Sequence, residues 1–291
     1  MPAEPTVETA VGPLDDERRS AVAALGARAA AADGVEALSE ASAIGLGREG
    51  ARHVLVPADG LQVSYAQVWV DGSCELVVDP GHRRQGLGTR VVTAAREQGA
   101  ERFWAHGALP AAAAAAVAWG LRPVRELRHM TRPLTGADAT DVELPPGYRV
   151  RTFVPGADDE AWLRTNARAF ADHPEQGRVG QADLDALVAQ PWFDPAGFFV
   201  VEEANAEGSL AAFHWTKHVA GTDVGEVFVV GVDPDHQGRG LAGPLTRLGL
   251  AHLARLGLGT VELYVDGLNE RAVRTYERIG FVTDAVDVVY A

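Results

Sequence analysis

Short apolar runs alternate with segments of helical periodicity throughout the second half of the chain. The runs are rich in valine and phenylalanine, which favour strands, and one helical segment carries leucines near the 3.6-residue spacing of a buried helix face. Gly280 follows the last helical segment, and helices commonly end before a glycine. The pattern predicts strands at 198–202, 210–214, 224–232, 260–265 and 286–290, and helices at 240–256 and 270–279.

The first half of the chain repeats this alternation. Two short segments also match in sequence: Asp79, Pro80 and Gly86 correspond to Asp233, Pro234 and Gly240 in the second half. Matches in the same order, half a chain apart, indicate a tandem duplication. We therefore predict an α/β protein with mixed sheets and two domains of one fold. The first-half pattern predicts strands at 53–56, 61–69, 74–78, 102–105 and 124–130, and helices from 88 and at 110–119.

The segment between the two copies is rich in proline, glycine and small polar residues. Such a composition is typical of a linker. We predict a first domain at 1–135, a linker at 136–147 and a second domain at 148–291.

Composition narrows the classes of function. Of the 291 residues, 47% are apolar, which is enough for two sizeable cores, and the formal net charge is -14. This charge argues against nonspecific binding to nucleic acid or to an anionic membrane. A single cysteine excludes an internal disulfide and fits a reducing cytoplasm, and neither a signal peptide nor a membrane span is evident. We expect a cytoplasmic monomer acting on small molecules, without a metal because the histidines and the cysteine show no ligand spacing.

Each copy contains a glycine-rich turn between a strand and a helix, at 237–242 and at 83–88. The backbone N–H groups of such a turn and of the helix start can bind an anion, and the helix dipole adds positive potential. Glycine also allows a pyrophosphate to approach the backbone closely. Neither segment is a Walker loop or a dinucleotide-binding fingerprint, because the residues that those motifs require are missing. By itself, the turn leaves a purely structural role open.

A second segment strengthens the case for an anion site. It contains Asn269, Ala272, Tyr276 and a final Gly280-Phe281 pair. Together with the turn it resembles the GNAT (Gcn5-related N-acetyltransferase) superfamily. The resemblance implies that acetyl-CoA lays its pantetheine arm along a strand edge and its pyrophosphate on the turn. In the second domain the residues so implicated are Val230, Gly231, Val232, Gln237, Gly238, Arg239, Gly240, Leu241, Ala242, Gly243, Asn269, Glu270, Arg271, Ala272, Val273 and Arg274. In the first domain they are Leu76, Val77, Val78, Arg83, Arg84, Gln85, Gly86, Leu87 and Gly88.

Acetyl transfer to an amine needs a base and an acid. The amine attacks only when neutral, so a carboxylate that takes its proton helps, and the leaving thiolate needs a proton donor. Glu226, on the strand before the turn, is the candidate base, and Tyr276 matches the family's general acid. Gly72 and Ala116 stand at the corresponding positions of the first domain. We therefore predict a non-catalytic first domain, with coenzyme A binding and a purely architectural role as its alternatives.

Along most of its length the chain also resembles the mycothiol synthases, a family of tandem GNAT enzymes. The segments 173–177 and 213–217 carry this closer resemblance, because they are not general features of the superfamily. It implies acetylation of the cysteine α-amine of cysteinyl-glucosaminyl-inositol. The family's substrate contacts fall on Glu40, Glu175, Lys217, Glu226 and Tyr264.

Two alternatives stay open on the sequence. One is a tandem GNAT enzyme that acts on another small amine, such as an aminoglycoside or a protein N-terminus. The other is a non-catalytic acyl-CoA-binding protein, against which Glu226 and Tyr276 argue.

Overall fold

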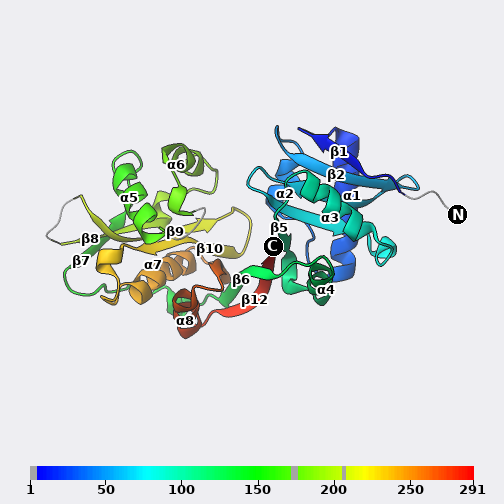
Figure 1. Ribbon diagram of the computed structural model, residues 1–291. Coiled ribbons are helices and arrows are strands. Elements are labelled where there is room, and N and C mark those ends of the chain that lie inside the picture. Colours follow the sequence, from blue (N-terminus) through cyan, green and yellow to red (C-terminus); the bar gives the residue numbers. More distant parts are fainter. Residues whose placement is uncertain (1–4, 172–175, 205–207) are drawn as a thin grey trace. The chain divides into compact units, whose positions relative to one another are not determined.

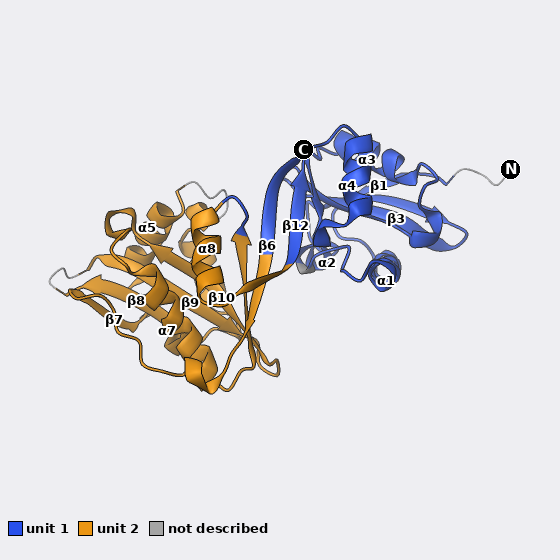
Figure 2. Ribbon diagram, turned by 90° about the horizontal axis from the view of Figure 1, so that it is seen from below, with its two compact units in different colours: residues 1–128, 266–268, 285–291 blue, residues 129–265, 269–284 orange. Residues whose placement is uncertain are grey.

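The computed structural model describes residues 5–171, 176–204 and 208–291. The chain forms two compact units, which Figure 2 colours separately. The first consists of residues 1–128, 266–268 and 285–291, and the second of residues 129–265 and 269–284. In each unit, helices pack against a sheet (Figure 1).

The first unit is built on a mixed sheet with helices on both faces. Strands β4 and β5 run parallel, and the other registered pairs are antiparallel. One face packs against α3 (Leu87–Glu97) and α4 (Pro110–Ala118), and the other against α1 (Asp16–Asp33) and α2 (Glu40–Gly45). The strand order is β1 (Glu8–Val11), β2 (Arg52–Ala58), β3 (Leu61–Val68), β4 (Ser73–Val78), β5 (Arg102–Ala105) and the end of β12 (Val282–Tyr290).

The second unit repeats this plan. Its aromatic core, with Trp162 and Trp215 fully buried, lies between the sheet and the helices α5 (Asp159–Ala169) and α6 (Gln181–Val188). Helices α7 (Ala242–Arg255) and α8 (Glu270–Arg278) pack on a second apolar cluster. The strand order is β7 (Tyr148–Thr152), β8 (Phe198–Glu203), β9 (Leu210–His218), β10 (Val224–Val232), β11 (Thr260–Asp266) and β6 (Pro123–Pro133), of which the residues from 129 on belong here.

Helix α7 lies very close to β9 because Gly249 has no side chain. A Cβ atom at this position would overlap the imidazole of His214. Nδ1 of His214 donates a hydrogen bond to the carbonyl oxygen of Leu245, at 2.8 Å. Burial of the ring lowers the pKa of His214 to about 4, so the imidazole is neutral at pH 7.

The α/β class and the duplicated plan that the sequence predicts are confirmed. Strands β5 and β10 have the predicted bounds, whereas β9 continues beyond residue 214 to His218 and so includes Lys217. The pattern did not reveal α1, α2, α5 and α6 or the edge strands β1 and β7. In α1 the reason is composition, since its alanines give little contrast between a buried and an exposed face.

The predicted linker 136–147 lies in the second unit of the structure. Asp138 accepts a hydrogen bond from the Arg132 guanidinium at 2.6 Å, and Leu144 packs beside Leu241 and Leu245. The bounds that the sequence suggests at 135 and 148 remain predictions about how the chain divides.

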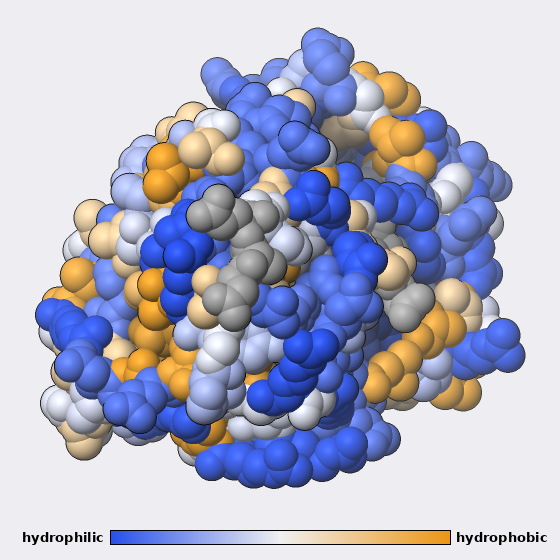
Figure 3. All heavy atoms as spheres, turned by 90° about the vertical axis from the view of Figure 1, so that its left-hand side faces the viewer, coloured by the Kyte–Doolittle hydropathy of each residue, from blue (hydrophilic) through white to orange (hydrophobic). Residues whose placement is uncertain are grey.

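Hydrophilic residues cover most of the face turned to the viewer in Figure 3, and apolar residues form small groups between them. Within residues 5–171, 176–204 and 208–291, no helix combines the length and the apolar content that a membrane span needs.

Candidate active site

Strand β10 leaves part of one backbone edge open. It pairs with β9 along its length, but its parallel register with β11 covers residues 224–226 and stops at the pair Glu226 and Glu262. A β-bulge between Val227 and Val229 interrupts the register with β9 just beyond this point. Unpaired backbone groups of a strand edge can accept an extended ligand as an added strand. The predicted pantetheine contacts Val230, Gly231 and Val232 lie on this stretch.

The glycine-rich turn follows β10 after a short 3₁₀ helix at Pro234–His236. Gly238 and Gly240 have φ values of 77° and 80°, which a residue with a side chain rarely adopts. Helix α7 starts after Leu241, and within the described residues no side chain caps its first N–H groups. Such a helix start can hold a phosphate. Arg239 is half-exposed beside the turn, 3.1 Å from Glu203.

An ion pair between a half-exposed arginine and a largely buried aspartate holds the strand end that precedes the turn. Two nitrogens of Arg168, on α5, donate to the Asp233 carboxylate at 2.8 and 3.0 Å. The first unit repeats this brace with Arg28 of α1 and Asp79, at 2.6 Å. Neither arginine was predicted from the sequence, because nothing near them in the chain marks their partners.

Glu226 is a half-buried carboxylate next to a lysine. Its partner across the β9–β10 register is Lys217, whose Nζ lies 3.1 Å from a Glu226 oxygen. The lysine ammonium also lies 5.5 Å from the ring centre of Trp192 and 5.7 Å from that of Phe228. Burial raises the pKa of Glu226, and Lys217 opposes that shift. A carboxylate with a raised pKa is a stronger base, as proton removal from an amine requires.

Tyr276 lies on α8 within the apolar cluster that also contains Val227, the neighbour of Glu226. Its ring meets that of Phe281 edge-on, at 5.7 Å between centres. Burial raises the pKa of Tyr276 to about 12, so the phenol keeps its proton at neutral pH. The hydroxyl therefore carries the proton that a general acid must hold before the reaction.

A line of polar side chains crosses the sheet of the second unit at the level of Glu226. Glu262 is the register partner of Glu226 on β11, and His129 Nε2 on β6 lies 2.9 Å from a Glu262 oxygen. The His129 ring also contacts Tyr264, with 4.9 Å between ring centres. Sequence analysis anticipated Lys217, Glu226 and Tyr264 in this region but not Glu262, His129, Trp192 or Phe228.

Two of the predicted substrate contacts have no described side chain. Glu40 begins helix α2 of the first unit, and its side-chain placement is not described. Glu175 lies outside the described residues. Both remain predictions.

The corresponding region of the first unit differs in detail. The register between β3 and β4 runs without a bulge, although β4 also leaves β5 after Glu75. Arg83 donates to both oxygens of Asp33 at 2.7 Å, so an internal carboxylate already occupies this predicted phosphate ligand. The Trp119 ring lies against Gly88, where a Cβ would come within 2.9 Å of it.

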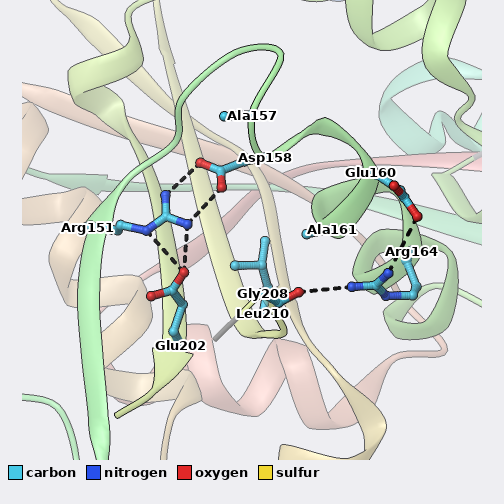
Figure 4. Close-up of a pocket in the computed structure, with 9 residues that line it drawn as sticks. All are labelled: Arg151, Ala157, Asp158, Glu160, Ala161, Arg164, Glu202, Gly208 and Leu210. Atoms are coloured by element: carbon cyan, nitrogen blue, oxygen red, sulfur yellow. Dashed lines mark hydrogen bonds and ion pairs between the residues drawn. The ribbon is translucent and has the colours of Figure 1, made fainter. Parts of the chain in front are cut away.

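Figure 4 shows a hollow elsewhere in the second unit. Arg151 there pairs with both Asp158 and Glu202, at 2.6 Å each, and Arg164 donates to the Gly208 carbonyl. The charged side chains that line this hollow pair with one another. They therefore stabilise the fold and leave little uncompensated charge for a ligand. No group of three or more metal-ligating side chains occurs within the described parts of the chain.

The model of the Acetyltransferase (GNAT) family matches residues 31–118 and again residues 161–281. The chain belongs to the GNAT family of acetyltransferases. The two matched segments correspond to the two units, and the acyltransferase class expected from the sequence is thereby confirmed.

Relatives with established names are similar over nearly the whole chain. A mycothiol acetyltransferase of Streptomyces coelicolor is 47% identical, over 99% of this chain and 96% of that protein. One of Thermobispora bispora is 49% identical, over 98% of each. Among solved structures, a GCN5-related N-acetyltransferase from Sphaerobacter thermophilus has a TM-score of 0.72 at 26% identity, over 97% of this chain and 94% of that one. A tandem GNAT protein of the clavulanic acid pathway shares the fold, with a TM-score of 0.70 at 18% identity over 98% of each chain.

Proposed function

We propose that this GNAT enzyme transfers the acetyl group of acetyl-CoA to the cysteine α-amine of cysteinyl-glucosaminyl-inositol, forming mycothiol. The observation that carries the proposal is the similarity to mycothiol acetyltransferases along almost the entire chain. The proposal includes a monomer acting in the cytoplasm.

Acetyl-CoA binds along β10 in this proposal. The pantetheine amides pair with the open backbone edge at 230–232, and the pyrophosphate lies on the N–H groups of the turn at 237–243. Gly231 suits this place because a side chain there would collide with Phe213. The thioester then lies near the bulge, beside Glu226.

Glu226 takes the proton from the acceptor amine. An α-amino group has a reference pKa of about 8, so roughly a tenth of it is neutral at pH 7. The rest is protonated, and a carboxylate with a raised pKa accepts that proton either directly or through water. The neutral nitrogen attacks the thioester carbon, the carbon–sulfur bond breaks, and the thiolate receives a proton from Tyr276. The nitrogen loses one proton as the amide forms, and this proton returns through water to the tyrosinate, which restores the phenol. Two shifts support these roles: burial raises the pKa of the Glu226 carboxyl, which makes it a stronger base, and raises the pKa of Tyr276 to about 12, so the phenol is protonated at pH 7.

Product mass is the direct test. Purified protein is incubated with acetyl-CoA and cysteinyl-glucosaminyl-inositol, and mass spectrometry follows the gain of one acetyl group, because the acceptor thiol interferes with thiol-release assays. An aminoglycoside and a peptide with a free N-terminus serve as comparison acceptors. We expect acetylation of the pseudo-disaccharide at the amine. Its absence, with acetylation of another amine, would replace the proposed substrate and leave the enzyme class intact.

A further inference from the structure

The second unit carries charged side chains that the proposed chemistry does not use. Lys217, Glu226, Glu262 and His129 follow one another across strands β9, β10, β11 and β6, and we call these four residues with Asp284 the polar row. Asp284, on β12, lies 3.5 Å from Nδ1 of His129. Glu226 is the base of the proposed reaction and Lys217 is an expected substrate contact, whereas Glu262 and His129 have no role so far.

Glu262 is placed as a neighbour of the base. The two glutamates are direct partners in the parallel register, so their side chains leave the sheet on the same face. The side chain of Glu262 is 29% exposed and that of Glu226 is 17% exposed, so solvent reaches both. The charge of Glu262 acts on Glu226, since it contributes to raising the pKa of that carboxyl.

His129 restrains Glu262. Its Nε2 faces a Glu262 oxygen at 2.9 Å while Nδ1 faces Asp284, so the imidazole lies between two carboxylates. The side chain of His129 is 20% exposed, and its ring packs against Tyr264. A ring held on three sides fixes the orientation of the carboxylate that it contacts.

The polar row has an excess of negative charge. Its three carboxylates face one ammonium and one imidazole, so even with a protonated imidazole the negative charges outnumber the positive ones. Glu226 and Glu262 are half-buried, whereas the side chain of Asp284 is 62% exposed. A cation that arrives beside the two half-buried carboxylates is attracted to both. The acceptor in the proposed reaction arrives mainly as an ammonium ion, because its pKa lies above neutral pH.

We propose that Glu262 is a second carboxylate of the acceptor site, which together with Glu226 binds the acceptor's ammonium before the reaction, and that His129 is a positioning residue that orients Glu262. The proposal rests on the proposed function, since it assigns a binding site to the amine of that reaction's acceptor. Glu226 then takes the proton while Glu262 stays ionised, so the neutral amine forms next to a remaining negative charge.

Lys217 fits this arrangement as an internal stand-in. Its ammonium is 3.1 Å from Glu226, where the acceptor nitrogen must come to lose its proton. The rings of Trp192 and Phe228 offer the lysine a second favourable contact, because an ammonium is attracted to aromatic faces. The arriving acceptor therefore shifts the lysine away from Glu226 without leaving its charge unsupported.

Steady-state kinetics of the Glu262→Gln variant test whether Glu262 binds the acceptor ammonium. We expect the KM for the acceptor to rise about 10-fold to 100-fold, the loss typical of one charge-assisted contact, and the KM for acetyl-CoA to stay within about twofold. His129→Gln should raise the acceptor KM by a smaller factor in the same direction. Glu160→Gln on α5, whose carboxylate is 98% exposed, is the matched control. An unchanged acceptor KM in a folded Glu262→Gln protein, or an equal rise in both KM values, overturns the proposal.

A second readout separates this proposal from the proposed function. Removing the charge of Glu262 should move the acid limb of the kcat/KM profile to lower pH, and a purely structural role would leave the limb in place. Titration of Glu226 by carboxyl ¹³C NMR measures the same shift without any acceptor. If the wild type forms no mycothiol, the proposed function fails, while the NMR titration separately shows whether Glu262 acts on Glu226. An unshifted Glu226 titration in Glu262→Gln contradicts the pairing of the two carboxylates on which the proposal depends.

Discussion

At the scale of single residues, burial shifts the pKa values of Glu226 and Tyr276 in the same direction. In both, the loss of water around the charged form raises the pKa, and in both the consequence is chemical. The raised pKa makes the carboxylate a stronger base and keeps the phenol protonated, as the proposed roles of base and acid require.

Removing either group should slow turnover without weakening acetyl-CoA binding. We expect Glu226→Gln and Tyr276→Phe each to lower kcat about 100-fold to 10,000-fold, the range for lost acid–base catalysis. The KM or Kd for acetyl-CoA should be unchanged, because neither side chain lies on the turn at 237–243. Stopped assays with mass detection and calorimetry measure the two quantities. Full turnover in both variants would remove their assigned roles.

Lys217 should set the pH at which Glu226 works. The lysine lowers the pKa of Glu226, so Lys217→Met should raise that pKa further. Because Glu226 acts as the ionised form, kcat/KM rises with pH through this pKa. The acid limb should therefore move to higher pH in Lys217→Met, opposite to the shift expected for Glu262→Gln. An unmoved limb would mean that another group controls it.

The sequence predicts some of these residues and not others, for a physical reason. Glu226 and Tyr276 stand at fixed distances from the glycine-rich turn, so local motifs identify them. Glu262 and His129 meet only because β11 and β6 lie side by side, and neither residue is part of a motif. A contact that depends on strand register across a fold cannot be read from spacing along the chain.

At the scale of elements, the site depends on how β10 leaves its neighbour. The bulge at Val227 and the end of the β11 register after residue 226 open one backbone edge at the place where Glu226 stands. The strands themselves were predicted from their valine-rich pattern. The open strand edge was expected from the family resemblance alone, since a period-two pattern describes a strand but not its loss of a partner.

Close packing of α7 on β9 gives a stability prediction. Gly249→Ala places a methyl group against the buried His214 ring, which is also held by Leu245. Overpacking of this kind costs about 1–3 kcal/mol, and the backbone of a strand cannot easily yield. We expect urea unfolding of the variant to show a lower midpoint with an unchanged slope. The control is Gly26→Ala, because Gly26 has open space around it. Gly257→Ala would not serve, because Gly257 has a positive φ. Equal midpoints for both variants would show that α7 moves freely away from β9.

At the scale of the whole molecule, duplication has given two units with one plan and different chemistry. The second unit has Glu226 and Tyr276, the proposed base and acid, whereas in both units the helix after the turn starts without a side-chain cap. The first has Gly72 and Ala116 at the matching positions, and its Arg83 is held by Asp33. It retains the positive φ of Gly86, at 82°, and a strand edge beyond Glu75. These retained features support binding of coenzyme A without turnover.

Calorimetric titration with acetyl-CoA can decide what the first unit does. If both turns bind the cofactor, the wild type should take up two molecules per chain, with the weaker event in the first unit because Asp33 must release Arg83. Gly240→Val strains the second turn, since φ there is 80°, and should abolish turnover together with one binding event. Gly238→Val, at a φ of 77° in the same turn, should act in the same way and guards against a single misfolded variant. One molecule per wild-type chain would instead show that the first turn is architectural, and the duplicated fold would then hold one acetyl-CoA site.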